Sequence, residues 1–184
     1  MILVVLVIVL LLLGGHADAA PAFSPPLPYY DWGACPFECC TYGEWTANGP
    51  TRVLRGRRRD ARLAFELKQG EKVQGVTGVV VTTRAGLAKV FKRTKLGTQG
   101  LSIAPGDVVY ILNYVGEGHW KFWFQGRVDT DQIPDINDQA ADSELDLRIA
   151  VRPQSMWWVK IRDQRGQVGW TDETSHFDHM DRCE

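Results

Sequence analysis

Long apolar runs are almost absent from this 184-residue chain. The only uninterrupted one, Met1 to Leu13, is too short to cross a bilayer comfortably, which excludes a multi-pass membrane protein. The sequence also lacks Gly-x-Ser-x-Gly, His-Glu-x2-His and any glycine-rich phosphate loop. No amphipathic helical pattern longer than about ten residues occurs. We therefore expect a protein that is not an enzyme and binds neither a cofactor nor a metal.

The first nineteen residues predict a secretory leader. The apolar run is followed by small residues, and Ala17-Asp18-Ala19 fits the small-x-small pattern that precedes a cleavage site. No Lys or Arg precedes the run, so only the terminal amine supplies positive charge there. We expect cleavage after Ala19 and export to the periplasm or outside the cell. The alternative is an uncleaved anchor, which would be the only attachment to a membrane.

Basic and acidic residues are segregated along the chain. Residues 51–100 carry 13 basic and 3 acidic side chains, whereas residues 101–184 carry 8 basic and 15 acidic ones. Such a split favours either charge pairing within the molecule or binding to an anionic partner. The candidate anion-binding residues are Arg55, Arg57, Arg58, Arg59 and Arg62. The alternatives are a solvated loop and a loop that pairs with the acidic stretch 129–146; export argues against nucleic acid.

Four cysteines are present: Cys35, Cys39, Cys40 and Cys183. An even number in an exported chain favours disulfides. A bond between the adjacent Cys39 and Cys40 would strain the intervening peptide, which favours the two connectivities that avoid it. The competing interpretation is a metal site that adds His176 and His179, but an oxidising compartment disfavours it.

Residues 20–50 form a segment rich in proline, glycine and aromatic residues. Its six prolines forbid a long helix and disfavour strands. Its aromatic side chains are costly to leave in water. We therefore predict an extended strap that lies on the folded body and is held there by the cysteines.

The rest of the chain predicts short strands separated by glycine turns. Leu63, Phe65 and Leu67 alternate with smaller or polar residues, which is typical of a half-buried strand. Residues 129–155 are expected to form a long acidic loop, and residues 175–184 a polar tail. The predicted fold class is all-β, built from small barrels. The other predicted strands are 72–83, 108–115, 119–128, 156–161 and 168–171.

Two segments share the pattern apolar-x-x-Gly-acid-x-Val. One runs from Leu67 to Val73 and the other from Ile103 to Val109, an offset of 36 residues. We interpret each as a turn that begins a core strand. The glycine supplies an unusual backbone angle, the acid hydrogen-bonds within the turn, and the valine points inward.

A further pattern lies near the C-terminus, where residues 158–161 read Trp-Val-Lys-Ile and residues 166–171 read Gly-Gln-Val-Gly-Trp-Thr. With the repeat, it resembles the bacterial SH3-like (SH3b) domains, whose closing hairpin has this form. The resemblance covers about residues 63–83 and 98–174. It implies two SH3-like barrels in tandem, the alternative being one larger barrel to which both copies of the repeat contribute. The first, over 51–97, would be degenerate; the second, over 98–174, would carry the acidic insertion 129–155.

The resemblance implies recognition rather than catalysis, because SH3b domains of exported bacterial proteins typically bind cell-wall peptides or glycans, or other envelope proteins. The candidate ligand-binding residues are Trp120, Trp123 and Trp157. Trp120 also shares a predicted core face with Phe122 and Phe124, while Trp158 is expected inside the fold and Trp157 outside.

Two other functions remain open at this stage. The first is a structural or assembly protein that docks an acidic partner or an anionic surface through the basic half of the chain. The second is an envelope hydrolase or thiol enzyme, in which a cysteine would act as the nucleophile.

Overall fold

The computed structural model describes residues 23–183, and the predicted leader lies outside this range. The described chain is almost entirely β-structure, as predicted, and its one helical element is the short 3-10 helix η1 (Thr174–His176). None of the described helices is long and apolar enough to span a membrane. The strands are β1 (Tyr29–Trp32), β2 (Glu44–Ala47), β3 (Thr51–Leu54), β4 (Leu63–Leu67), β5 (Lys72–Arg84), β6 (Gly86–Val90), β7 (Thr94–Leu96), β8 (Leu101–Ile103), β9 (Val109–Gly116), β10 (His119–Phe124), β11 (Arg127–Gln132), β12 (Leu147–Val151), β13 (Gln154–Arg162), β14 (Val168–Thr171) and β15 (Phe177–Asp178).

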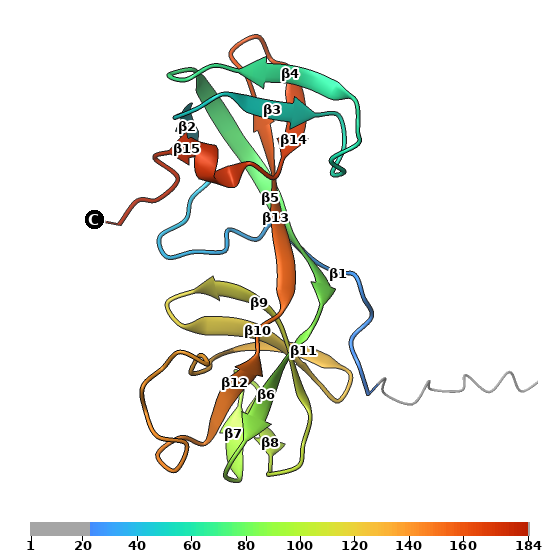
Figure 1. Ribbon diagram of the computed structural model, residues 1–184, viewed down its shortest axis with the longest axis vertical. Coiled ribbons are helices and arrows are strands. Elements are labelled where there is room, and N and C mark those ends of the chain that lie inside the picture. The colour runs from blue at the N-terminus through green and yellow to red at the C-terminus, as the bar shows by residue number, and fades with distance from the viewer. Residues whose placement is uncertain (1–22, 184) are drawn as a thin grey trace, which may run out of the picture.

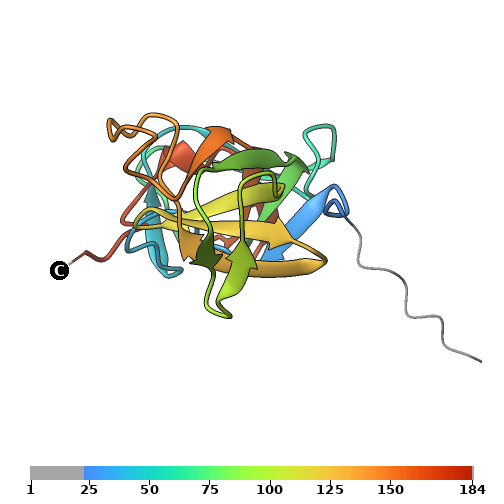
Figure 2. The ribbon, with the colours of Figure 1, turned by 90° about the horizontal axis from the view of Figure 1, so that it is seen from below.

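The strands form two units, one above the other along the long axis of the molecule (Figure 1). The first, which we call the split unit, is an eight-stranded sheet that contains β2–β5, β13–β15 and also β1, which pairs with β5. The second, the inserted unit, contains a five-stranded sheet in the order β11-β10-β9-β6-β12 and the separate β7–β8 hairpin. Seen from below, the inserted unit lies in front of the split unit (Figure 2).

The long strands β5 and β13 connect the two units. They pair antiparallel from Gln74 opposite Arg162 to Arg84 opposite Gln154, and the chain between Arg84 and Gln154 folds as the inserted unit. The units therefore differ from the predicted domains 51–97 and 98–174. The split unit is assembled from both sides of the inserted unit, because its sheet needs β13 and β14 as well as β5.

The closing hairpin forms as predicted, but it belongs with the first copy of the repeat. β14 pairs with β13 and also with β3, where Trp170 lies opposite Leu54. Gly166 has φ +81° in the connecting turn. At Gly169 a Cβ would lie 2.6 Å from Val53 Cγ1, so only glycine lets β3 approach β14 this closely.

The two copies of the repeat have the same local structure. Gly70 and Gly106 have φ +85° and +98°, and the following acids accept hydrogen bonds from backbone amides three residues before them, at Lys68 and Ala104. The valines at the end of each copy, Val73 and Val109, are buried. The interpretation of each segment as a turn that begins a core strand is confirmed.

Each unit has its own hydrophobic core. In the split unit the fully buried Trp45 contacts Tyr42, Trp157 and Phe177, and Gly75 provides the room for its ring. In the inserted unit Trp120, Phe122 and Phe124 lie on one face of β10 and are buried, as their alternation predicts. Trp45 belongs to the predicted strap, so part of that segment lies inside the fold.

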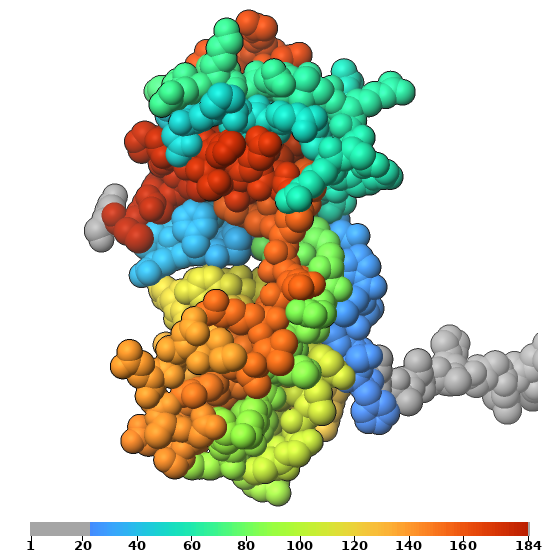
Figure 3. Space-filling model, viewed as in Figure 1, coloured from blue at the N-terminus to red at the C-terminus, as the bar shows by residue number. Residues whose placement is uncertain are grey.

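Two disulfides hold the strap and the C-terminal segment together. They are Cys35–Cys40 and Cys39–Cys183, one of the two connectivities that the sequence favoured. The predicted polar tail 175–184 is therefore attached to the fold over its described residues, 175–183. Phe177 is buried, β15 pairs with β2, and Cys183 is bonded to the strap. In the space-filling view the blue strap lies at the junction of the two units (Figure 3).

The acidic loop is shorter than predicted. β11 extends into the start of residues 129–155 and β12 lies near their end, so the connection between the two strands is limited to residues 133–146. Leu147 and Ile149 of β12 are buried in the core of the inserted unit. These two positions were expected in the loop because acidic residues dominate the stretch before them.

Candidate binding site

A cavity of about 440 Å³ opens on the surface of the inserted unit. Two aromatic side chains from neighbouring strands line it: Tyr114 from β9 and Trp120 from β10. Their ring centroids lie 5.1 Å apart in an edge-to-face arrangement. The other lining residues are Gly118, Ile133, Asp135, Asp138 and Arg152. The cavity thus combines aromatic and apolar walls with charged groups.

The aromatic wall is fixed by local structure. The β9–β10 turn brings Gly118 back over Tyr114, and the Gly118 amide donates a hydrogen bond to the Tyr114 hydroxyl at 3.0 Å. Trp120 is only 8% exposed, because most of its indole belongs to the core of the inserted unit. The remaining ring surface is held rigidly where a ligand can contact it.

The charged side of the cavity is held by two adjacent segments of the chain. Arg152 donates from Nε and from one terminal nitrogen to the two oxygens of Asp135, at 2.9 and 2.7 Å. The hydrogen bonds and the charge of Asp135 raise the pKa of Arg152 above its usual value. Asp138 accepts a hydrogen bond from the Asp135 amide at 2.6 Å. Such paired, oriented groups suit a ligand that offers both hydroxyl and carboxylate groups.

The three predicted tryptophans do not form one site. Trp120 lines the cavity, whereas Trp123 lies on the opposite face of β10, partly buried, with an enclosed Nε1 that has no hydrogen-bond partner among the described residues. Trp157 belongs to the split unit. Its Nε1 donates to the Ala34 carbonyl at 3.1 Å, and Phe37 packs edge-on against its ring.

The prediction that Trp157 lies outside the fold is wrong, because Ala34 and Phe37 of the strap cover its side chain. Tyr42 also donates its hydroxyl to the Ala34 carbonyl, and burial raises the pKa of Tyr42 to about 12. Trp158 is buried, as predicted. The strap could not be located on Trp157 from sequence, because their contact joins residues more than a hundred positions apart.

The basic run lies in the loop between β3 and β4 and divides into paired and unpaired residues. Arg58 pairs with Asp60, and Arg59 pairs with Asp172 at 2.7 Å. Among the described residues, Arg55, Arg57 and Arg62 form no ion pair. None of these arginines contacts the acidic loop, whose partners are instead Lys89, Lys92, Arg148 and Arg152. The basic and acidic halves of the chain are therefore joined by a few individual ion pairs, and the basic run does not pair with the acidic stretch 129–146.

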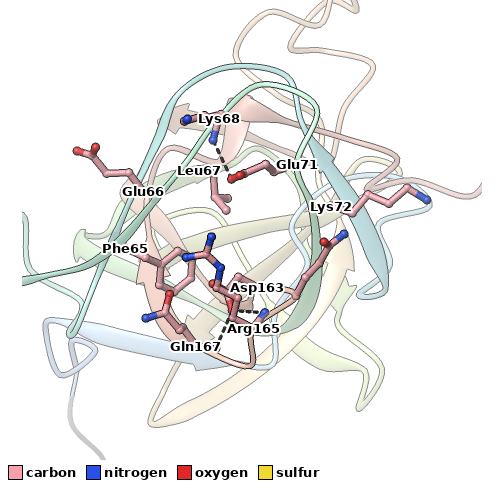
Figure 4. A pocket seen from close by; sticks show the side chains of 10 residues that line it. Phe65, Glu66, Leu67, Lys68, Glu71, Lys72, Asp163, Arg165 and Gln167 are labelled. Atoms are coloured by element: carbon pink, nitrogen blue, oxygen red, sulfur yellow. Dashed lines mark hydrogen bonds between the residues drawn. The ribbon is translucent and has the colours of Figure 1, made fainter.

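A second cavity, of about 410 Å³, lies at one end of the split unit between the β4–β5 and β13–β14 turns (Figure 4). Three acidic side chains line it, Glu66, Glu71 and Asp163, and two of them are engaged within their own turns. Glu71 accepts from the Lys68 amide, and Asp163 accepts from the amides of Arg165 and Gln167. These carboxylates shape the turns, so we regard the cavity of the inserted unit as the better ligand site.

All four cysteines are engaged in disulfides, and the described residues contain no group of three or more His, Cys, Asp or Glu side chains placed to hold a metal. The metal site considered for His176 and His179 would need free cysteine thiols, and the disulfides use all four cysteines. The chain is an all-β protein with two disulfides, a feature consistent with folding in an oxidising compartment. Comparisons with family models, curated proteins and solved structures found no match to it.

Proposed function

We propose that this chain is an exported, non-catalytic binding module that recognises a cell-wall peptide or glycan through the cavity of the inserted unit. The observation that carries this proposal is the edge-to-face pair of Tyr114 and Trp120 beside the Asp135–Arg152 ion pair. The size of the cavity falls in the range of small-molecule sites, which is about 300–1,000 Å³. The resemblance of the hairpin 158–171 to SH3b domains supports recognition as the role of the chain, whereas the choice of this cavity rests on its lining residues alone, because the hairpin belongs to the split unit.

The chemistry of the cavity suits one sugar ring or one short peptide segment. The apolar face of a sugar, or an aliphatic side chain, would pack on the exposed parts of Tyr114 and Trp120. Asp138 would accept hydrogen bonds from hydroxyl or amino groups, and Arg152 would donate to a carboxylate or an acetyl oxygen. The structure needs no moving part for this role, because the ion pair already fixes both charges.

Sedimentation with purified peptidoglycan tests the proposal. The exported protein should pellet with the wall, and both Asp138→Asn and Arg152→Gln should weaken binding at least about tenfold, the effect of losing one charge-assisted hydrogen bond. Arg165→Gln is the matched control, since it removes one exposed charge at the cavity of the split unit. Equal binding by all four proteins, or no binding by any, would refute the assignment.

Export and the absence of catalysis belong to the same proposal. In the folded protein a thiol enzyme would need a free cysteine, whereas the described cysteines are all oxidised. The native protein should therefore fail to react with a thiol probe until reductant is added. Recovery of the chain from the periplasm or the medium, with both disulfides formed, would support the location. Labelling of the native protein without reductant would favour the thiol-enzyme alternative.

A further inference from the structure

The outer face of the edge strand β1 exposes two large aromatic side chains. Tyr30 and Trp32 are 43% and 61% exposed, and their rings stack with centroids 6.0 Å apart. Between them Asp31 points into the protein and is buried, so the alternation of the strand directs both rings outward. The strap aromatics were expected to be covered by the folded body, and these two are not.

One arginine of the basic run lies against this aromatic face. The Arg57 guanidinium carbon is 4.3 Å from the Trp32 ring centroid, 5.6 Å from that of Tyr30 and 5.3 Å from that of Trp170. Lys160 Nζ lies 5.9 Å from the Trp170 ring centroid. Aromatic rings hold the Arg57 cation in place by cation–π attraction. They leave its charge free for an external anion.

The surroundings of Arg57 remain positively charged. Arg55 and Arg62, at either end of the same loop, are exposed and make no ion pair among the described residues. Asp60 of the same loop and Asp172, which follows β14, are already paired with Arg58 and Arg59. The loop therefore carries three guanidinium groups without an ion-pair partner among the described residues, and that of Arg57 lies against two exposed aromatic rings.

We infer that this face, formed by Tyr30, Trp32 and Trp170 with Arg55, Arg57 and Arg62, docks on an anionic lipid surface. The combination matches the headgroup region of a bilayer, where phosphates lie next to an apolar boundary. Tryptophan and tyrosine are enriched at that boundary, and clustered basic side chains are attracted to anionic headgroups. A soluble anion would use the guanidinium groups but would leave the exposed rings without a function. The segment that leads into β1 also exposes Phe23 and Leu27.

The inference goes beyond the proposed function and uses different residues. The cavity of the inserted unit contains none of the residues that form this face. It also differs from the expectation that only an uncleaved leader would attach the chain to a membrane. A bilayer contact would hold the protein at a membrane while the cavity remains available for a wall component.

Vesicle flotation with the protein recovered after export tests this inference. It should bind vesicles that contain phosphatidylglycerol at least about tenfold more tightly than vesicles of phosphatidylcholine alone, and the affinity should fall as salt is raised. Trp32→Ala should lower the affinity by removing the interfacial ring, and Arg57→Gln by removing the central cation. Neither change should prevent folding, because Trp32 is exposed and Arg57 lies in a loop. Native disulfides and an unchanged circular dichroism spectrum would verify that each variant is folded.

Arg165→Gln is the charge-matched control and should bind as the parent protein does. Three results would overturn the inference: no binding to anionic vesicles, equal binding to phosphatidylcholine, or affinity for soluble polyphosphate as high as for vesicles with no effect of Trp32→Ala. The peptidoglycan experiment with Arg152→Gln reports on the other site. Failure of one experiment is therefore distinguishable from failure of the other.

Discussion

Lys121 Nζ lies 2.5 Å from Asp31 Oδ1, and this ion pair joins the strap to the inserted unit. Asn113 donates from Nδ2 to the other oxygen of Asp31 at 3.0 Å. Asp31 and Asn113 are buried, at 7% and 1% exposed. β1 pairs only with β5 in the sheet of the split unit, whereas Lys121 and Asn113 belong to the sheet of the inserted unit. The cluster therefore fixes the position of one unit against the other.

Replacing Asp31 with Asn should destabilise the protein by about 1–3 kcal/mol, because Lys121 would keep its charge in a partly buried place without an anion. Denaturant unfolding measures this change. The matched control is Glu44→Gln, which breaks an exposed pair of 2.7 Å with Lys72 and should cost much less stability, because solvent screens that pair. Equal costs for the two variants would show that the Asp31 pair has no special role.

Replacing Gly169 with Ala should destabilise the split unit by about 1–3 kcal/mol, since the added methyl would overlap Val53 and the Leu54 carbonyl. Thermal unfolding provides the measurement. Gly49→Ala is the control, because its Cβ would meet no atom within 4 Å. A melting temperature for Gly169→Ala that matches the control would contradict the close approach of β3 and β14.

The two disulfides should contribute unequally to stability. On the chain-entropy model, Cys39–Cys183, with its sequence separation of 144, restricts the unfolded chain by about 5 kcal/mol. Cys35–Cys40, with a separation of 5, contributes about 2 kcal/mol. Unfolding of the Cys39→Ser/Cys183→Ser and Cys35→Ser/Cys40→Ser double variants compares them. A larger loss from removing the short loop would contradict this order.

The β7–β8 hairpin should loosen in acid. Burial raises the pKa of Asp129, but hydrogen bonds from Thr130, Thr98 and Gln99 outweigh it and hold the pKa below its usual value of 3.8. Two of these donors belong to the hairpin turn, so the ionised carboxylate anchors it to β11. A lowered folded-state pKa means that this stabilisation is complete above pH 3.8 and is lost as the pH falls through the folded-state value.

Hydrogen exchange at the Gln99 amide measures this change. Protection should be constant near neutral pH and should decrease below the usual aspartate pKa, apart from the intrinsic pH dependence of exchange. Asp129→Asn should show weakened protection at neutral pH and a smaller additional loss in acid. An unaltered acid profile in this variant would assign the transition to a different group.

Local features of the fold followed from sequence because they depend on residues within one turn or one strand. The two Gly-acid turns at Gly70 and Gly106 need only a glycine and an acid at fixed spacing, and both formed as predicted. The buried face of β10 followed from strict alternation. The candidate site was found in part, through Trp120. Asp135 and Arg152 were missed as a pair, although an acidic loop that ends near an isolated base is a usable signal.

An all-β chain, its turns, its alternating strands and a choice between two disulfide pairings thus followed from the residues alone. The folded molecule was needed to show that the hairpin 158–171 joins the sheet of β5 across an inserted unit, that the strap covers Trp157, and that Arg57 lies against Trp32. Turn geometry and alternation are set by near neighbours in the chain. Strand partners and cross-chain contacts depend instead on which distant surfaces bury the most apolar area together.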